Sequence, residues 1–407
     1  MPILSFIRAN AKFLLAGFLI SYLSSFGQTF FLSIFAGEIR AEFGLSHGNW
    51  GTVYGLSTMV SAVVMLWAGV LTDRFRVRTL AVIVVLGLAV ASIGMALAKS
   101  LWMLFGVIFL LRFLGQGMMS HISGVAMARW FVASRGRALA IAALGFSAGE
   151  ASLPVSFVAA KSLMDWRMLW VVGAGLLVVA MPFIQVLLRA ERTPQSMAKE
   201  AQGTGMAGRH WSRSEVLRHP LFWLLVPALL GPAAFNTSFF FQQVHLAEVK
   251  GWAHVSLVAI FPVYSAATVA AMLTSGWMVD RFGAVSLMAA YQLPLVAFFF
   301  GMGQIDTLPF AAPMLILLGL TSGAQATIPT AFWAEVYGTR NIGAIKALAG
   351  AVMVLGSAFG PMLTGLAIDA GIVYPRQMPV IAVYFLIAAG LVWLGVRIAK
   401  KSLPAPP

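Results

Sequence analysis

Two ionisable side chains lie deep inside long apolar stretches of this chain. Arg112 falls in the apolar run 101–127, and Glu150 falls in the run 137–160. At 1.5 Å of rise per residue, about eleven residues separate Arg112 from the outer end of its run, and about thirteen separate Glu150 from the inner end of its own. Charged groups at such depth in a membrane are costly and usually mark a transport pathway, a proton relay or an ion pair.

Similar depths on antiparallel neighbouring helices make Arg112 and Glu150 candidates for an ion pair, while depth alone leaves open whether their helix faces meet. Burial and a neighbouring cation act in opposite directions on the protonation of a carboxyl group, which suits a site that exchanges protons. We therefore expect Glu150, together with Arg112, to couple transport to protons. Two structural alternatives stay open: Arg112 locks helices together, or Glu150 serves only as the partner of Arg112.

Other polar residues inside the apolar runs are candidates for contact with a substrate. The set that we expect to bind substrate comprises Arg112, Gln28, Tyr54, Asn236, Tyr264 and Gln325. Hydroxyl and amide groups in lipid also join helices to one another, so each neutral member has a structural alternative.

The sequence contains no pattern typical of an enzyme or of a cofactor site. It has no cysteine, its histidines lack the spacing of metal ligands, and it has no phosphate-binding loop of the P-loop type. We expect no metal, no cofactor and no catalytic residues.

The composition places most of the chain in lipid. Hydrophobic residues make up 60% of the 407 residues and charged residues only 10%, whereas soluble domains are about a quarter charged. The first apolar run continues to Phe35 without a cleavage pattern, so we expect a first span there rather than a signal peptide. Runs of roughly 20 apolar residues predict an all-α membrane protein with twelve transmembrane helices, at 13–36, 50–71, 79–98, 101–127, 137–160, 167–188, 220–244, 254–279, 284–305, 308–334, 343–368 and 377–397.

The basic residues orient these spans. With both termini in the cytoplasm, the inner segments hold 20 of the 27 lysines and arginines and the outer segments hold six. The positive-inside rule therefore predicts cytoplasmic termini, and it explains the net charge of +14 without nucleic acid. The polar stretch 189–219 predicts a cytoplasmic linker between bundles of six helices at 1–188 and 220–407.

One heptapeptide pattern occurs twice, 207 residues apart. Gly-x-x-x-Asp-Arg-Phe is found at 69–75 and again at 276–282, each time between two predicted spans. This motif resembles the signature loop of the major facilitator superfamily, and together with twelve spans the resemblance covers nearly the whole chain. It implies two pseudo-symmetric six-helix bundles that rock about a central site near mid-membrane. It also implies gating residues, which are Gly69, Asp73, Arg74, Gly276, Asp280 and Arg281.

Two further stretches are similar to that superfamily. Arg112-Phe113-Leu114-Gly115-Gln116-Gly117 looks like its arginine-containing motif in span four, with the glutamine shifted. The Gly-x-x-x-Gly stretches that begin at Gly145 and Gly356 align with each other, and family members often carry proline after such a stretch. Pro361 keeps that proline in the second half, whereas Glu150 replaces it in the first half.

The segments 241–252 and 333–340 resemble bacterial members of the monocarboxylate-porter-like branch, although span eight lacks the cation common there. We expect a monomeric secondary transporter of the bacterial inner membrane that moves a small organic solute, most consistently an organic anion, by proton-coupled symport. Its partners are the substrate, protons and membrane lipids. The alternatives are proton-coupled efflux of lipophilic or cationic compounds, and a non-transporting receptor on the same scaffold.

Overall fold

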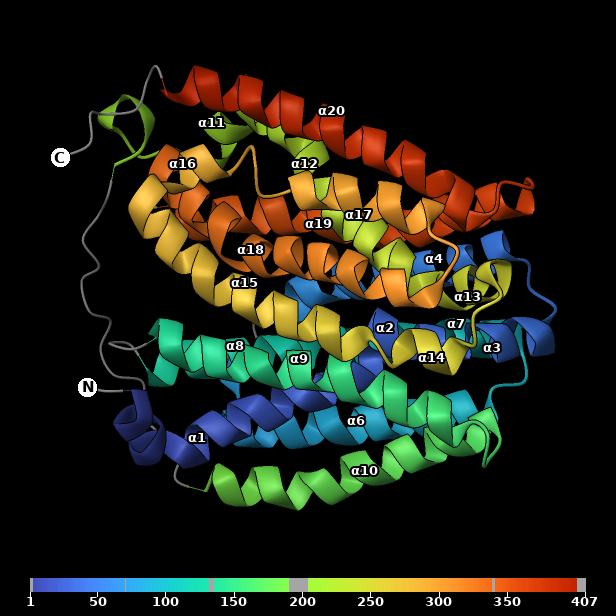
Figure 1. The fold of residues 1–407 in the computed structure, drawn as a ribbon. Coiled ribbons are helices and arrows are strands. Elements are labelled where there is room, and N and C mark those ends of the chain that lie inside the picture. Colours follow the sequence, from blue (N-terminus) through green and yellow to red (C-terminus); the bar gives the residue numbers. More distant parts are fainter. Residues whose placement is uncertain (1–2, 70, 132–134, 190–203, 339–340, 401–407) are drawn as a thin grey trace. The chain divides into compact units, whose positions relative to one another are not determined.

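The structure, a computed structural model, describes residues 3–69, 71–131, 135–189, 204–338 and 341–400 (Figure 1). A few side chains within these ranges, those of Asp73 and Asp280 among them, are also outside the description. Every element among the described residues is a helix. The chain divides into two compact units, residues 1–199 and 200–407.

Unit 1 carries six helical segments, several of them interrupted. The first consists of α1 (Ile3–Leu23), the 3₁₀ turn η1 (Ser24–Gly27), α2 (Thr29–Leu32), η2 (Ser33–Phe35) and α3 (Ala36–Phe43). Then follow α4 (His47–Ala68), the short α5 (Leu71–Arg74) and α6 (Val77–Leu97). The fourth segment joins α7 (Leu101–Leu111), the π-helix η3 (Arg112–Met119) and α8 (Ser120–Trp130), and the last two are α9 (Arg135–Ala160) and α10 (Trp166–Leu187).

Unit 2 repeats this order. It begins with η5 (Met206–Gly208) and α11 (Arg213–Arg218), followed by α12 (Pro220–Phe241), α13 (Gln243–Lys250) and α14 (His254–Val258). Next come α15 (Phe261–Phe282), α16 (Ala284–Leu287), α17 (Leu293–Gln304) and η6 (Leu308–Phe310). The unit ends with α18 (Ala311–Tyr337), α19 (Ile342–Asp369) and α20 (Tyr374–Lys400).

These helices account for the twelve predicted spans. Among the described residues, ten helices are long and apolar enough to cross a membrane. The 22-residue α4 and the shorter apolar α17 fall in the remaining two predicted spans. The all-α, twelve-helix expectation is therefore confirmed.

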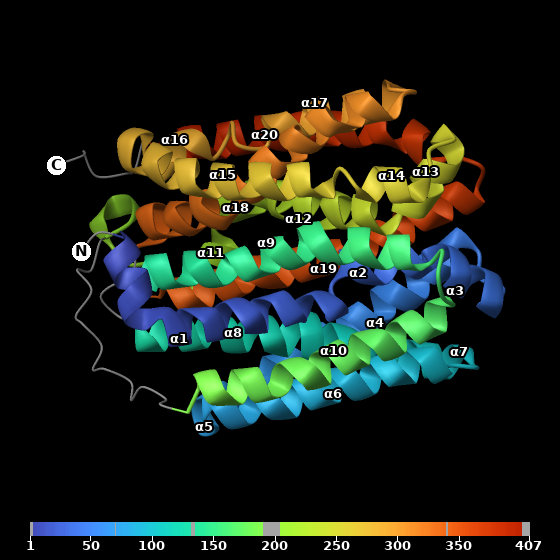
Figure 2. The same ribbon diagram turned by 60° about the horizontal axis from the view of Figure 1, so that its bottom comes forward.

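The same helix pairs pack in both units. The first helix lies on the fifth (α1 on α9, α12 on α19), the second on the fourth (α4 on α7 and η3, α15 on α18), and the third on the sixth (α6 on α10, α17 on α20). Figure 2 shows α6 and α10 side by side, with α1 against α8 and α9. A shared pairing pattern is the structural counterpart of the sequence repeat.

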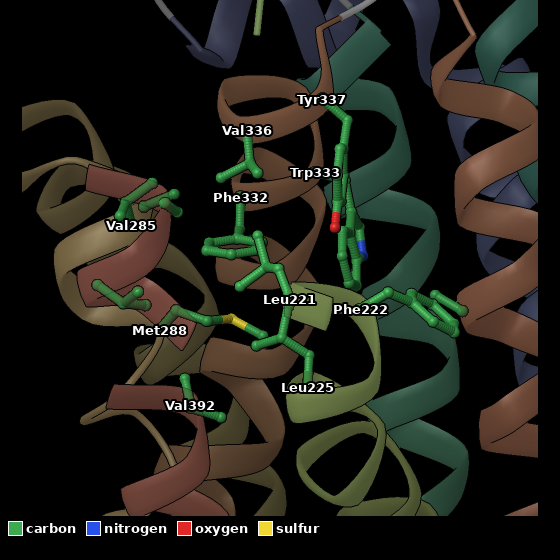
Figure 3. Close-up of a cluster of buried hydrophobic side chains, with 14 of the residues drawn as sticks. Leu221, Phe222, Leu225, Val285, Met288, Phe332, Trp333, Val336, Tyr337 and Val392 are labelled. Atoms are coloured by element: carbon green, nitrogen blue, oxygen red, sulfur yellow. The ribbon is translucent and has the colours of Figure 1, made fainter. Parts of the chain in front are cut away.

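Part of the segment expected as a linker packs into unit 2. Met206, Trp211 and Val216 are buried in the same apolar cluster as Trp333 and Tyr337. The Trp211 amide donates to the Tyr337 carbonyl at 3.0 Å. Figure 3 shows the neighbouring part of this cluster, where Leu221 and Phe222 of α12 lie close to Phe332, Trp333 and Tyr337 of α18. Residues 204–219 thus form part of the described packing of unit 2.

Candidate functional site

Arg112 is a buried cation that neutral groups hold in place. The side chain is 1% exposed. Its Nε donates to Thr58 Oγ1 at 3.2 Å, and its Nη1 donates to the carbonyl oxygen of Gly27 at 3.0 Å. Nη2 has no hydrogen-bond partner among the described residues. The positive charge therefore has no acidic counterpart in the described part of the chain.

Tyr54 lies beside this guanidinium. Arg112 Cζ is 5.1 Å from the centre of the Tyr54 ring, a cation–π geometry. The Tyr54 hydroxyl in turn hydrogen-bonds the hydroxyl of Thr29. Tyr54 and Thr58 are one turn apart on α4, so a single helix face supplies both a ring and a hydroxyl to Arg112. The structure thus joins two predicted substrate residues, Arg112 and Tyr54, in one cluster.

The backbone around Arg112 departs from α-helix on two sides. Arg112 begins the π-helix η3, a form that occurs frequently at functional sites. Opposite lies the turn η1, after which Gln28 is extended (φ −87°, ψ 155°). Both interruptions depend on glycine, because a Cβ built at Gly27 would lie 2.1 Å from the Leu111 carbonyl and one at Gly115 would lie 2.5 Å from Gly27 Cα. The break in the first span therefore presents the Gly27 carbonyl to Arg112.

Glu150 is buried on α9 and is 3% exposed. No hydrogen bond or ion pair joins its carboxyl group to a residue that the structure describes. Burying an unpaired carboxylate is very unfavourable, so this environment accommodates the neutral, protonated form. The predicted ion pair between Arg112 and Glu150 is wrong: both side chains are described, and no contact within ion-pair distance joins them.

The glycines beside Glu150 confirm the alignment of the two halves. A Cβ at Gly145 would lie 2.0 Å from the carbonyl oxygen of Phe18, and a Cβ at Gly356 would lie 2.6 Å from that of Leu230. One turn later, Gly149 approaches Tyr22 and Gly360 approaches Ala234, again at backbone carbonyls. The fifth helix of each unit therefore packs on the first helix in one register. In that register, Glu150 occupies the place of Pro361.

Of the other predicted substrate residues, Gln28 lies in unit 1, and Asn236, Tyr264 and Gln325 lie in unit 2. Gln28 is buried at the break of the first span, and Tyr264 packs edge-on against Phe240, with ring centres 5.3 Å apart. Asn236 is partly buried on α12 and its Oδ1 lacks a partner among the described residues. Gln325 is partly buried on α18.

The two signature loops differ in their surroundings. Gly69 closes α4, and the His121 ring lies 3.3 Å from its carbonyl oxygen and 3.4 Å from Thr72 Oγ1. Gly276 has nothing within 4 Å of a Cβ built on it, so close helix packing does not explain this second glycine. Arg74 and Arg281 are exposed. The side chains of Asp73 and Asp280 lie outside the description.

The sequence did not predict several groups that contact Arg112 or the second signature loop. Thr58 and the Gly27 carbonyl hold Arg112, and the spacing of Thr58 from Tyr54 by one helical turn was the signal for the first. Glu335 was also missed: its carboxylate accepts the amide of Ala284 at 2.9 Å, just after the second signature loop. No spacing rule could place it, because 51 residues separate the two groups.

Comparisons with known proteins identify the family. The sequence model of the Major Facilitator Superfamily matches residues 17–361. No curated protein matches the chain. Nothing in the comparisons supports the monocarboxylate-porter-like branch.

Solved structures show the same fold. Two inward-facing crystal structures of a bacterial homolog of the human lysosomal transporter Spinster, one unoccupied and one occupied, are similar with TM-scores of 0.71 and 0.72. Both are 18% identical, with both chains fully covered. A mutant of the nucleoside transporter NupG is similar with a TM-score of 0.66 at 16% identity, over 96% of this chain and 100% of that chain. With the family match over most of its length, the chain is a membrane transporter that belongs to the major facilitator superfamily.

Proposed function

We propose that this transporter carries a small organic anion together with protons across the bacterial inner membrane, as a monomer with both termini in the cytoplasm. The observation that carries the proposal is Arg112. It is a fully buried cation whose recorded partners are a hydroxyl, a backbone carbonyl and an aromatic ring. A buried positive charge needs an anion to compensate it, and no described residue provides one. The anionic group of a substrate would meet this requirement.

Glu150 would carry the proton. Its carboxyl group is buried and lacks a partner among the described residues, so its charged and neutral forms differ strongly in free energy. Any movement that changes access of water to Glu150 would therefore change its protonation. In this proposal the proton and the anion bind at separate groups of unit 1 and neutralise one another on transfer.

The test is uptake into proteoliposomes that contain the purified full chain. Radiolabelled lactate, benzoate and succinate serve as probes, with and without an inward proton gradient. We expect at least one probe to accumulate with the gradient and to stop accumulating when a protonophore dissipates it. Arg112→Gln should reduce uptake by more than about 100-fold, since losing one partner of a buried charge pair costs about 3–5 kcal/mol. Arg376→Gln, at an exposed arginine, is the matched control.

One observation favours a second candidate. An unpaired buried carboxyl such as Glu150 could also attract a lipophilic cation. One turn before it on α9, Phe146 packs against Phe30 of α2 with ring centres 5.6 Å apart. Proton-driven exchange of ethidium that Glu150→Gln abolishes, without uptake of any anion, would support cation efflux. Absence of flux for every probe would point to a receptor.

A further inference from the structure

Two buried polar groups without partners lie on either side of one helix contact in unit 1. Ser25 in η1 is fully buried, and its Oγ has no partner among the described residues. Glu150 on α9 is buried and also has none. Each unsatisfied buried group requires an explanation. Because both groups lie where the first span meets α9, a single explanation can account for both.

Aromatic contacts show which face of α9 carries Glu150. Phe146, one turn before it, packs against Phe30 with ring centres 5.6 Å apart. Phe157, two turns after it, packs against Phe31 at 4.8 Å. Residues at these spacings share one helix face. Glu150 therefore lies on the face of α9 that covers the interrupted segment 24–32.

Gly149 brings Ser25 to this face. A Cβ at Gly149 would lie 2.1 Å from Ser25 Oγ, so only glycine allows the hydroxyl to approach α9 here. Glu150 is the next residue. By contrast, the neighbouring Ser24 is equally buried, but its hydroxyl donates to the Ser21 carbonyl at 2.6 Å. At the break of the first span, the Ser25 hydroxyl thus lies next to α9 without a hydrogen-bond partner among the described residues.

We propose that Ser25 is the positioning residue of Glu150. When the carboxyl group releases its proton to water, the Ser25 hydroxyl donates to the carboxylate. Because the Gly27 carbonyl two residues later holds Arg112, this bond links the protonation of Glu150 to the anion site through η1, without a direct ion pair. The inference rests on the proposed role of Glu150 as proton carrier.

Few other titratable groups face Glu150 from the elements packed on α9. α1 contributes Arg8 and Lys12 toward its N-terminal end, and Tyr22 near Gly149. The Tyr22 hydroxyl is already bonded to Ser152 at 3.1 Å. α8 carries His121, held at Gly69, together with Arg129, whose side chain is not described. η1 and α2 contain no titratable residue.

The test is a pH titration by infrared difference spectroscopy of the purified full chain in phosphatidylcholine vesicles. The C=O stretching band of a protonated carboxyl is assigned to Glu150 by its absence in Glu150→Gln. We expect Ser25→Ala to raise the midpoint of this band by about one to two pH units, the size expected for the loss of one hydrogen bond to a charged group. Ser24→Ala and Tyr22→Phe should leave it in place.

Each outcome decides between explanations. An unchanged midpoint in Ser25→Ala, or a shift in Arg112→Gln alone, would overturn the proposal. If no band disappears in Glu150→Gln, both this inference and the proton role fail. Because the titration needs no substrate, absence of anion uptake together with a normal shift would reject only the proposed substrate. Should Ser25→Ala fail to fold, Ser25→Cys, a similar shape with a weaker donor, should give a smaller shift.

Discussion

In each unit, a cationic side chain donates to the carbonyl groups at the end of the third helix, but it comes from a different element in unit 1 than in unit 2. In unit 1, Arg167 donates to the carbonyls of Ala96 and Ala98, where α6 ends. In unit 2, Lys250 donates to Gly303 and Ile305, 207 residues later, where α17 ends. Arg167 comes from the start of the sixth helix, whereas Lys250 ends the first segment of its unit. The requirement to satisfy helix-terminal carbonyls has been kept while the residue that meets it has changed.

The interiors of the two units differ more sharply. Unit 1 buries Arg112 and Glu150, whereas the register of the fifth helices gives unit 2 Pro361 in place of the acid. In the fourth helix of unit 2, Gly319 and Gly323 bring α18 against the backbone of α15, with Cβ positions 2.6 Å from the Tyr264 carbonyl and 2.1 Å from that of Thr268. Arg112 begins a π-helix in the corresponding helix of unit 1. The repeat therefore preserves packing, while the buried arginine and the buried glutamate among the described residues both lie in unit 1.

The largest effect should come from giving unit 2 the missing acid. Pro361→Glu buries a carboxylate with no partner at a position that the structure packs tightly. We expect a loss of about 3–5 kcal/mol in the free energy of unfolding at pH 8, and a smaller loss at pH 5, where the carboxyl group can stay protonated. Thermal unfolding of the purified protein, with Pro361→Ala as control, measures this. Equal stability of Pro361→Glu and control at pH 8 would show that unit 2 tolerates charge as well as unit 1 does.

The shared register of the fifth helices predicts matched losses. Gly145→Ala and Gly356→Ala both drive a methyl group into a backbone carbonyl, so each should cost about 1–3 kcal/mol. Gly106→Ala and Gly350→Ala are controls, since nothing lies within 4 Å of a Cβ at either. Thermal unfolding compares the four variants. A loss confined to one unit would break the equivalence of the two contacts.

The cation caps predict a smaller difference. Lys250→Ala leaves two helix-end carbonyls without their donor, and we expect it to cost about 1–3 kcal/mol. The acid near Lys250, Asp306 at 3.7 Å, is 93% exposed, so Asp306→Ala should change stability by less than about 0.5 kcal/mol. Chemical unfolding of both variants tests whether the carbonyls or the ion pair matter. Equal losses in both variants would favour the ion pair.

The smallest effect concerns the pH dependence of stability at the start of α12, the first long helix of unit 2. His219 Nδ1 accepts the amide of Leu221 at the start of α12, and burial, together with nearby Arg209, lowers the pKa of His219. Between that lowered pKa and about 6.5, the unfolded chain binds more protons than the folded one, so stability rises with pH across this window. Hydrogen exchange of peptide 205–222, corrected for intrinsic rates, should show protection declining as pH falls from 8 to 5.

His219→Asn keeps a capping group and should flatten this dependence. Glu215 does not interfere, because its hydrogen bonds to Ser212 lower its pKa and place its titration below the range tested. If protection in His219→Asn falls between pH 8 and pH 5 as it does in the unmodified protein, a group other than His219 causes the pH dependence.

The sequence predicted the spans and the repeat because hydropathy and motif spacing are local properties. It did not predict the interruptions η1 and η3, since glycine contacts between helices far apart in the chain, such as Gly27 with Gly115, stabilise them. The ion pair between Arg112 and Glu150 failed for a related reason. Depth along a helix can be counted from residues, but the direction of a side chain around the helix depends on neighbours that only the folded chain reveals.

The π-helix in span four has a geometric consequence of its own. Each residue that a wider turn adds rotates everything downstream by about 100° relative to an uninterrupted α-helix. A helical wheel drawn through span four with a single period therefore misdirects every side chain after Met119. His121, which contacts Gly69 and Thr72, lies just after the π-helix. A helical wheel with a single period would therefore place His121 on the wrong face of the helix.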